Sequence, residues 1–118
     1  REVSSFLTER MRVAEQAGIR ADNIILDPGF GFGKSVEHNY QLLASLEQLH
    51  ILGHPLLVGV SRKSMLGAVT GRDVNERLPA SLAAATISAM KGASILRVHD
   101  VRETVDAVRI VTAVKEAI

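Results

Sequence analysis

Three short apolar runs constrain most strongly how this chain can fold. They are residues 24–26, 56–60 and 95–98, with gaps of roughly thirty residues between them. Helical spacing of apolar residues precedes the first run and recurs after it, an alanine-rich stretch follows the second run, and a long valine-rich stretch follows the third. This order predicts one helix and then three strand–helix units. Strands that are apolar on both faces are typical of a parallel sheet covered by helices. The sequence therefore predicts an α/β fold.

The predicted helices occupy about residues 3–14, 40–49, 77–91 and 100 onward. Gly18 and Gly92 follow the first and third of them and are suitable stops. In the last helix, Asp100 is a natural N-cap and Glu103 would complete a capping box. Residues 67–75 are polar and contain glycine, so we expect a loop or a broken helix there.

The 118 residues suffice for one domain, but three parallel strands with open edges seldom stand alone. The chain also starts at Arg1, inside a predicted helix and without a methionine. We therefore expect residues 1–118 to be a single partial domain of a larger protein whose upstream strands are absent here. A (β/α)8 barrel, which needs about 250 residues, would accommodate this chain as its C-terminal portion.

Bulk properties exclude several classes of function. The net charge of +1 predicts no nucleic-acid partner, and the lack of cysteine excludes disulfides and thiolate metal sites. We find no signal peptide and no apolar stretch long enough to cross a bilayer, so a cytoplasmic protein without a membrane partner is expected.

A glycine-rich turn, residues 27–35 (DPGFGFGKS), follows the first apolar run. It lacks the first half of a phosphate-binding P-loop, and its glycine spacing fits the dinucleotide fingerprint poorly. Two of the three phenylalanines, Phe30 and Phe32, lie in this turn, where no core should require them, and they favour a ligand site. The alternative is a flexible turn that Asp27 merely closes.

The other two runs also end in polar residues. Residues 61–64 (SRKS) follow the second run, and Arg97 and His99 lie on one face of the third. An arginine within a buried strand is costly unless its charge is paired. Arg97 could therefore bind an anionic ligand or form a buried ion pair within the protein. Residues 61–64 could equally be a solvated basic loop, and His99 an ordinary histidine. In a barrel, Asp27, Lys63, Arg97 and His99 could line one cleft.

These three motifs, in this order and spacing, closely resemble dihydropteroate synthase. Segments 76–78 and 81–83 between them are similar to that family as well. The resemblance covers nearly the whole chain and implies the C-terminal three βα units of a TIM (β/α)8 barrel, preceded by one helix.

The resemblance implies a transferase of folate biosynthesis that joins 6-hydroxymethyl-7,8-dihydropterin diphosphate to p-aminobenzoate, giving 7,8-dihydropteroate and pyrophosphate. It also implies Mg²⁺ bound with the substrate diphosphate rather than by this chain, a homodimer, and competition by sulfonamides. The implied roles are as follows: pterin binding by Asp27, Gly31, Lys63 and Arg97; p-aminobenzoate binding by Phe32 and Ser61; diphosphate binding by Arg97 and His99; and catalysis by Lys63, Arg97 and His99.

Two alternatives remain at this point. A pterin-binding methyltransferase acting on methyltetrahydrofolate would share the barrel and the pterin acid, although it would release no diphosphate to meet the cationic groups. A noncatalytic half-barrel would serve only assembly or ligand capture. As part of a synthase, the 118 residues alone are expected to be inactive.

Overall fold

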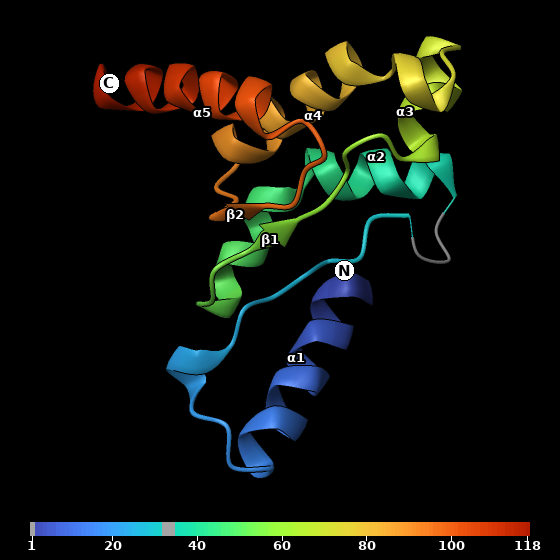
Figure 1. Cartoon of the computed structure of the whole chain (residues 1–118). Coiled ribbons are helices and arrows are strands. Elements are labelled where there is room, and N and C mark those ends of the chain that lie inside the picture. Colours follow the sequence, from blue (N-terminus) through green and yellow to red (C-terminus); the bar gives the residue numbers. More distant parts are fainter. Residues whose placement is uncertain (1, 32–34) are drawn as a thin grey trace.

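The computed structural model describes residues 2–31 and 35–118. Helices dominate, and two short strands lie between them (Figure 1). In chain order the elements are α1 (Glu2–Gln16), η1 (Ala21–Asn23), α2 (Val36–Ala44), η2 (Leu46–Leu52), β1 (Leu57–Val58), α3 (Ser64–Thr70), η3 (Val74–Glu76), α4 (Leu78–Met90), β2 (Ile95–Leu96) and α5 (Val101–Glu116).

The sheet is parallel, as the apolar runs predict. Strands β1 and β2 pair with Leu57 opposite Ile95, and a single parallel bridge joins Leu26 to Leu56. The first predicted strand is therefore reduced to one bridging residue at the edge of the described sheet. The α/β class is confirmed, with three parallel segments in the spatial order of the chain.

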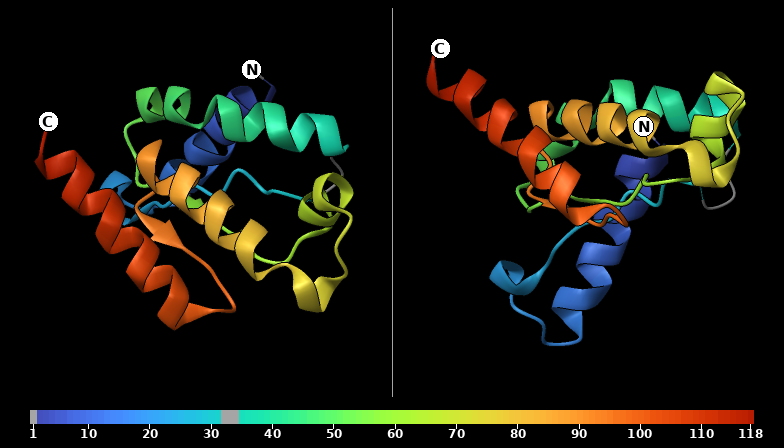
Figure 2. Two further views of the ribbon diagram at one scale, coloured as in Figure 1. Left: turned by 90° about the horizontal axis from the view of Figure 1, so that it is seen from above. Right: turned by 45° about the horizontal axis from the view of Figure 1, so that its top comes forward.

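The helices lie unevenly about the strands. Figure 1 shows α2, α3, α4 and α5 on one side of the strands and α1 on the other, and both views of Figure 2 agree. Apolar side chains between the strands and these helices form the core. Its most fully buried members are Phe30, Leu46, Leu56, Met65 and Val58.

The expectation that the strands are buried on both faces is wrong for the described residues. Leu56 and Val58 are buried under the helices, whereas Ile25 is 52% exposed and Ile95 is 38% exposed. Arg97 follows Ile95 on the same face and is exposed too. Because its side chain is exposed, Arg97 does not carry the cost of a buried arginine.

Two local expectations also need correction. Phe30 is only 1% exposed and belongs to the hydrophobic core, so the glycine turn does contribute a core residue. Asp100 precedes α5, but its side chain makes no capping hydrogen bond, because its carboxylate binds Arg62 instead. The predicted capping box is therefore not formed.

The helix boundaries follow local chemistry. Helix α2 begins earlier than predicted, because Ser35 caps it by accepting a hydrogen bond from the His38 amide. It gives way at Ser45 to the tighter turns of η2. The predicted broken helix at 67–75 corresponds to α3 and η3, and α4 and α5 agree closely with their predicted ranges.

Candidate active site

Three polar segments meet at the carboxyl ends of the strands. Residues 27–31 follow the Leu26 bridge, residues 61–63 follow β1, and residues 97–100 follow β2. Parallel strands bring such segments to one edge of a sheet. Side-chain hydrogen bonds join the first segment to the second and the second to the third, so the predicted convergence of the three motifs is observed.

Asp27 closes the glycine turn. One oxygen of its carboxylate, Oδ1, accepts a hydrogen bond from the Gly29 amide at 2.8 Å, and the residue is exposed. The local role that we weighed as an alternative is therefore real. An exposed carboxylate whose Oδ1 is fixed by the backbone is also well oriented to accept further N–H groups.

Asn39 orders the end of the same turn, a role that the sequence did not reveal. Its Oδ1 accepts from the Gly31 amide at 2.9 Å, and its Nδ2 donates to the Ser35 carbonyl at 3.1 Å. Asn39 is buried at 4% exposure. The only signal in the sequence was a polar residue among the apolar positions of α2. Phe32, predicted near p-aminobenzoate, lies outside the described residues.

Lys63 joins the β1 end to the glycine turn. Its ammonium Nζ donates to the Phe30 carbonyl at 2.5 Å. Its side chain also lies along Gly31, where an added Cβ would come within 3.3 Å of the Lys63 Cδ. Gly31 and Lys63, both predicted to bind the pterin, are therefore in contact.

Ser61 joins the β1 end to the β2 end. Its buried hydroxyl accepts from the His99 amide at 3.3 Å and lies 3.0 Å from the imidazole Nδ1. Because Nδ1 is occupied in this way, Nε2 is the ring nitrogen through which His99 can contact a ligand. The structure thus gives Ser61 a contact with His99, and its predicted role near p-aminobenzoate stays a prediction.

Arg97 lies across the backbone of Gly59. A Cβ added to Gly59 would come within 2.7 Å of Nη2 and 3.0 Å of Nε of this guanidinium. Only glycine at this position of the chain following β1 gives the arginine room to lie flat over the strand. The Arg97 guanidinium and the His99 imidazole thus occupy the exposed face of β2 and its extension.

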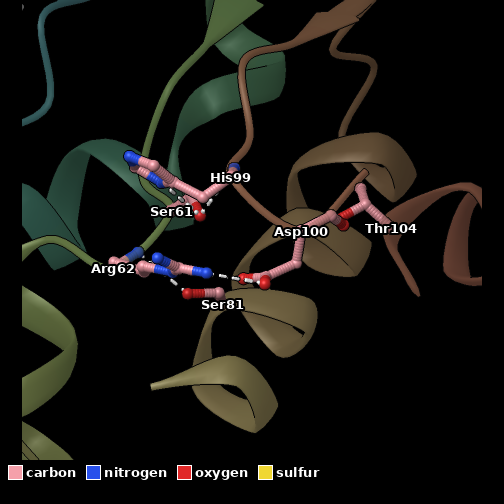
Figure 3. A network of polar contacts seen from close by, with 6 residues as sticks. All are labelled: Ser61, Arg62, Ser81, His99, Asp100 and Thr104. Carbon is pink, nitrogen blue, oxygen red and sulfur yellow. Dashed lines mark hydrogen bonds and ion pairs between the residues drawn. The ribbon is translucent and has the colours of Figure 1, made fainter. Parts of the chain in front are cut away.

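Arg62 faces away from its neighbours in the sequence and toward Asp100 (Figure 3). Its Nη2 and Nε lie 2.7 and 3.3 Å from the two oxygens of the Asp100 carboxylate. These hydrogen bonds raise the pKa of the Arg62 guanidinium above its usual value. The loop 61–64 is therefore not simply a solvated basic loop, because one of its cations is engaged in an ion pair.

Some predicted neighbours are not joined directly. Within the described residues, no hydrogen bond links Asp27 to Lys63, Arg97 or His99; these groups share only the strand edge. That these four side chains line one cleft stays a prediction. A groove of about 320 Å³ lies on the opposite side of β2, between α4 and α5, and is lined by Leu96, Val98 and other mainly apolar residues.

The described residues offer no ready metal site and no membrane-spanning helix. They contain no group of three histidine or acidic side chains placed to hold a metal ion. None of the helices in this part of the chain has the length and hydropathy that crossing a bilayer requires. The site is thus a strand edge that carries the exposed side chains of Asp27, Arg97 and His99 beside the half-buried Lys63.

Comparison with known proteins places this geometry in a family. Residues 1–99 match the family described as pterin binding enzyme. The chain is 53% identical to dihydropteroate synthase of Escherichia coli K12, covering 98% of this chain but 41% of that protein. For Haemophilus influenzae dihydropteroate synthase, the identity is 49% and the coverage of that protein 42%.

A solved structure agrees in fold. The Yersinia pestis dihydropteroate synthase with a sulfonamide drug superposes with a TM-score of 0.97 at 49% identity, covering 99% of this chain and 43% of that chain. This chain therefore spans less than half the length of these relatives. The match to the family over most of the sequence, together with the shared fold, shows that the chain belongs to the pterin binding enzymes.

Proposed function

We propose that this chain is part of a dihydropteroate synthase, which condenses 6-hydroxymethyl-7,8-dihydropterin diphosphate with p-aminobenzoate to 7,8-dihydropteroate and pyrophosphate. The observation that carries the proposal is the meeting of three motifs at one strand edge, in a chain whose relatives bear that name. A relative from Xanthomonas albilineans with 7,8-dihydropteroate superposes with a TM-score of 0.94.

The proposal includes the place of the chain in a barrel. Its three parallel segments would be the last three strands of a TIM (β/α)8 barrel, and residues 1–118 one partial domain of it. The exposed Ile25 and Ile95 support this placement, because the inner face of a barrel strand is covered by side chains from other strands. The polar strand edge would then be the carboxyl-terminal face, where barrel enzymes bind substrates.

The site residues suit the two parts of the pterin substrate. The Asp27 carboxylate can accept two N–H groups of the pterin ring, with Gly31 and Lys63 beside it. Arg97 and His99 can bind the diphosphate, because a guanidinium and an imidazole on one exposed face suit a polyanion. Ser61 and Phe32 would lie near p-aminobenzoate, the position at which sulfonamides would compete.

The chemistry needs positioning and charge stabilisation. The bond between the pterin methylene carbon and the diphosphate oxygen breaks with its electron pair leaving as pyrophosphate. The amine nitrogen of p-aminobenzoate forms the new C–N bond and loses a proton. Lys63, Arg97 and His99 would stabilise the departing anion, which is the group that gains charge in the transition state.

Further partners belong to the same proposal. The described residues do not form a metal cage, so Mg²⁺, a cation that prefers oxygen ligands and often binds through substrate phosphates, would arrive with the diphosphate. A cytoplasmic homodimer without nucleic-acid or membrane partners completes the proposal.

The test is p-aminobenzoate-dependent pyrophosphate release by the whole polypeptide that contains this chain. We expect release that requires both substrates, is inhibited by a sulfonamide, and is lost in Asp27→Ala. Asp22→Ala, at an exposed aspartate of η1, is the matched control and should retain activity. A folded protein that binds pterin without releasing pyrophosphate would contradict the proposal and favour methyl transfer.

A further inference from the structure

We propose that Arg62 and Asp100 are positioning residues that fix the distance between Lys63 and His99, and thus between the pterin and diphosphate subsites. This inference rests on the proposed function. Neither member of the pair is assigned to a substrate: Arg62 directly precedes Lys63 in the chain, and Asp100 directly follows His99. An ion pair between them therefore ties together the loops that carry the two subsites.

The backbone at Arg62 is held in an uncommon conformation. Arg62 has a φ of 57°, the only positive φ among the described residues other than glycine. Such a conformation persists only where the surroundings determine it. Its amide donates to the Ser81 Oγ at 2.8 Å, and its carbonyl accepts from the Arg77 Nη1 at 3.0 Å. The turn that separates Ser61 from Lys63 is thus fixed from both sides.

Asp100 is anchored just as firmly on the other loop. Its carbonyl accepts from the Thr104 hydroxyl at 2.7 Å and from the Thr104 amide at 3.0 Å, which fixes it to the first turn of α5. Its carboxylate side chain is only 17% exposed and faces the guanidinium of Arg62 (Figure 3). The Arg62–Asp100 pair therefore connects one anchored backbone to another.

A fixed spacing matters for one kind of ligand in particular. The pterin diphosphate has to reach Lys63 and His99 at once, and a ligand that spans two subsites gains affinity only when their separation matches it. Pterin alone is held mainly beside Lys63 and pyrophosphate alone mainly beside His99, so each depends less on the distance between the two. Loss of the pair should consequently weaken the spanning ligand and spare its halves.

The experiment is calorimetric titration of the whole polypeptide with three ligands: the pterin diphosphate, the pterin alcohol without diphosphate, and inorganic pyrophosphate. In Asp100→Ala we expect affinity for the pterin diphosphate to fall about ten-fold, because small displacements in a positioned site are costly. Affinity for each half should change less than about three-fold. Asp100→Asn and Arg62→Lys should lie between Asp100→Ala and the wild type, and the double variant Arg62→Ala/Asp100→Ala should be no worse than the single one.

The matched control is Glu47→Ala, which breaks the ion pair of Glu47 with Lys91, 2.9 Å long and at the other end of the strands. It should leave all three affinities unchanged. Equal weakening of all three ligands in Asp100→Ala would show general damage and overturn the inference, and so would no change for any of them.

If the wild type binds none of these ligands, the proposed function is refuted. Amide hydrogen exchange still tests whether the Arg62–Asp100 pair couples the two loops. The Lys63 amide is bonded to Val60 and the His99 amide to Ser61. Both amides should exchange faster in Asp100→Ala and not in Glu47→Ala. Unchanged exchange at both positions would refute the coupling by itself.

Discussion

The two ends of the parallel strands use their cations differently. At the amino end, lysine and histidine side chains contact the carbonyls that helices leave open. Lys91 donates to Ala44, Lys115 donates to Ala89, and His50 lies 3.2 Å from the Lys91 carbonyl. Such contacts satisfy helix termini and contribute to stability.

At the carboxyl end, Arg62 and Lys63 also bind groups of the loops, but other basic side chains face outward. Lys63 binds a carbonyl of the glycine turn, while Arg97 and His99 lie on an exposed face. The comparison teaches that one end of this α/β unit is built mainly for packing and the other for binding. Substitutions at the two ends should therefore separate stability from activity.

The largest expected effect on stability concerns Phe30, which is a core residue although it lies at the carboxyl end of the strands. Phe30→Ala should lower the free energy of unfolding by about 3–5 kcal/mol, because it opens a cavity in the core. Phe6→Ala, at a side chain that is 64% exposed, is the control and should change little. Denaturant titration measures both, and a stable Phe30→Ala protein would place Phe30 outside the folding core.

Arg97→Ala should give the largest loss of activity. If Arg97 stabilises the departing diphosphate, kcat/KM for pyrophosphate release should fall about 10²–10³-fold. The exposed position of the arginine predicts little change in stability. Arg102→Ala, at an exposed arginine of α5, serves as control, and an active Arg97→Ala enzyme would remove this account of catalysis.

Two glycines provide the sharpest contrast between the ends. Gly92 has a φ of 99°, and an added Cβ would overlap the His50 ring, so Gly92→Ala should cost about 1–3 kcal/mol of stability. Gly59→Ala meets only the flexible Arg97 guanidinium, which can move aside, so activity should fall while stability changes by about 1 kcal/mol or less. Thermal unfolding and steady-state kinetics distinguish them, and equal effects on both quantities would break the comparison.

Tyr40→Phe should give the smallest effect. The Tyr40 hydroxyl donates to the Met65 carbonyl at 2.8 Å, and its loss should cost about 1 kcal/mol. Burial raises the pKa of the Tyr40 phenol, so its contribution is complete below the unfolded pKa of about 10 and is lost as pH rises through the folded value. Stability of Tyr40→Phe should therefore fall less steeply above pH 10 than that of the wild type. An identical pH profile would contradict this.

The sequence predicted the elements that local patterns determine. Apolar spacing placed α1, the alanine-rich stretch before Gly92 placed α4, and length placed α5. The strand alternation correctly put Arg97 and His99 on one face. The convergence of the three strand ends followed from parallel topology alone. These features depend on neighbours within a few residues or on a general rule of α/β folds.

The sequence did not predict the features that depend on contacts between residues distant in the chain. Phe30 is buried in a core cluster with residues distant in the chain, such as Leu46 and Met65, and no local pattern shows that. Asp100 forms an ion pair with Arg62, 38 positions earlier in the chain, and does not cap α5. The positive φ at Arg62 likewise depends on Ser81 and Arg77, contacts that only the tertiary structure brings together.

The buried Asn39 makes the glycine turn dependent on a single nitrogen atom. Its Oδ1 must accept from Gly31 while its Nδ2 donates to Ser35, so aspartate, which has the same shape, cannot replace it. Hydrolysis of this amide during the chemical ageing of the protein would place a carboxylate against the Ser35 carbonyl, two acceptors with no proton between them. The lifetime of the binding turn is thereby linked to how well α2 keeps water away from one side-chain amide.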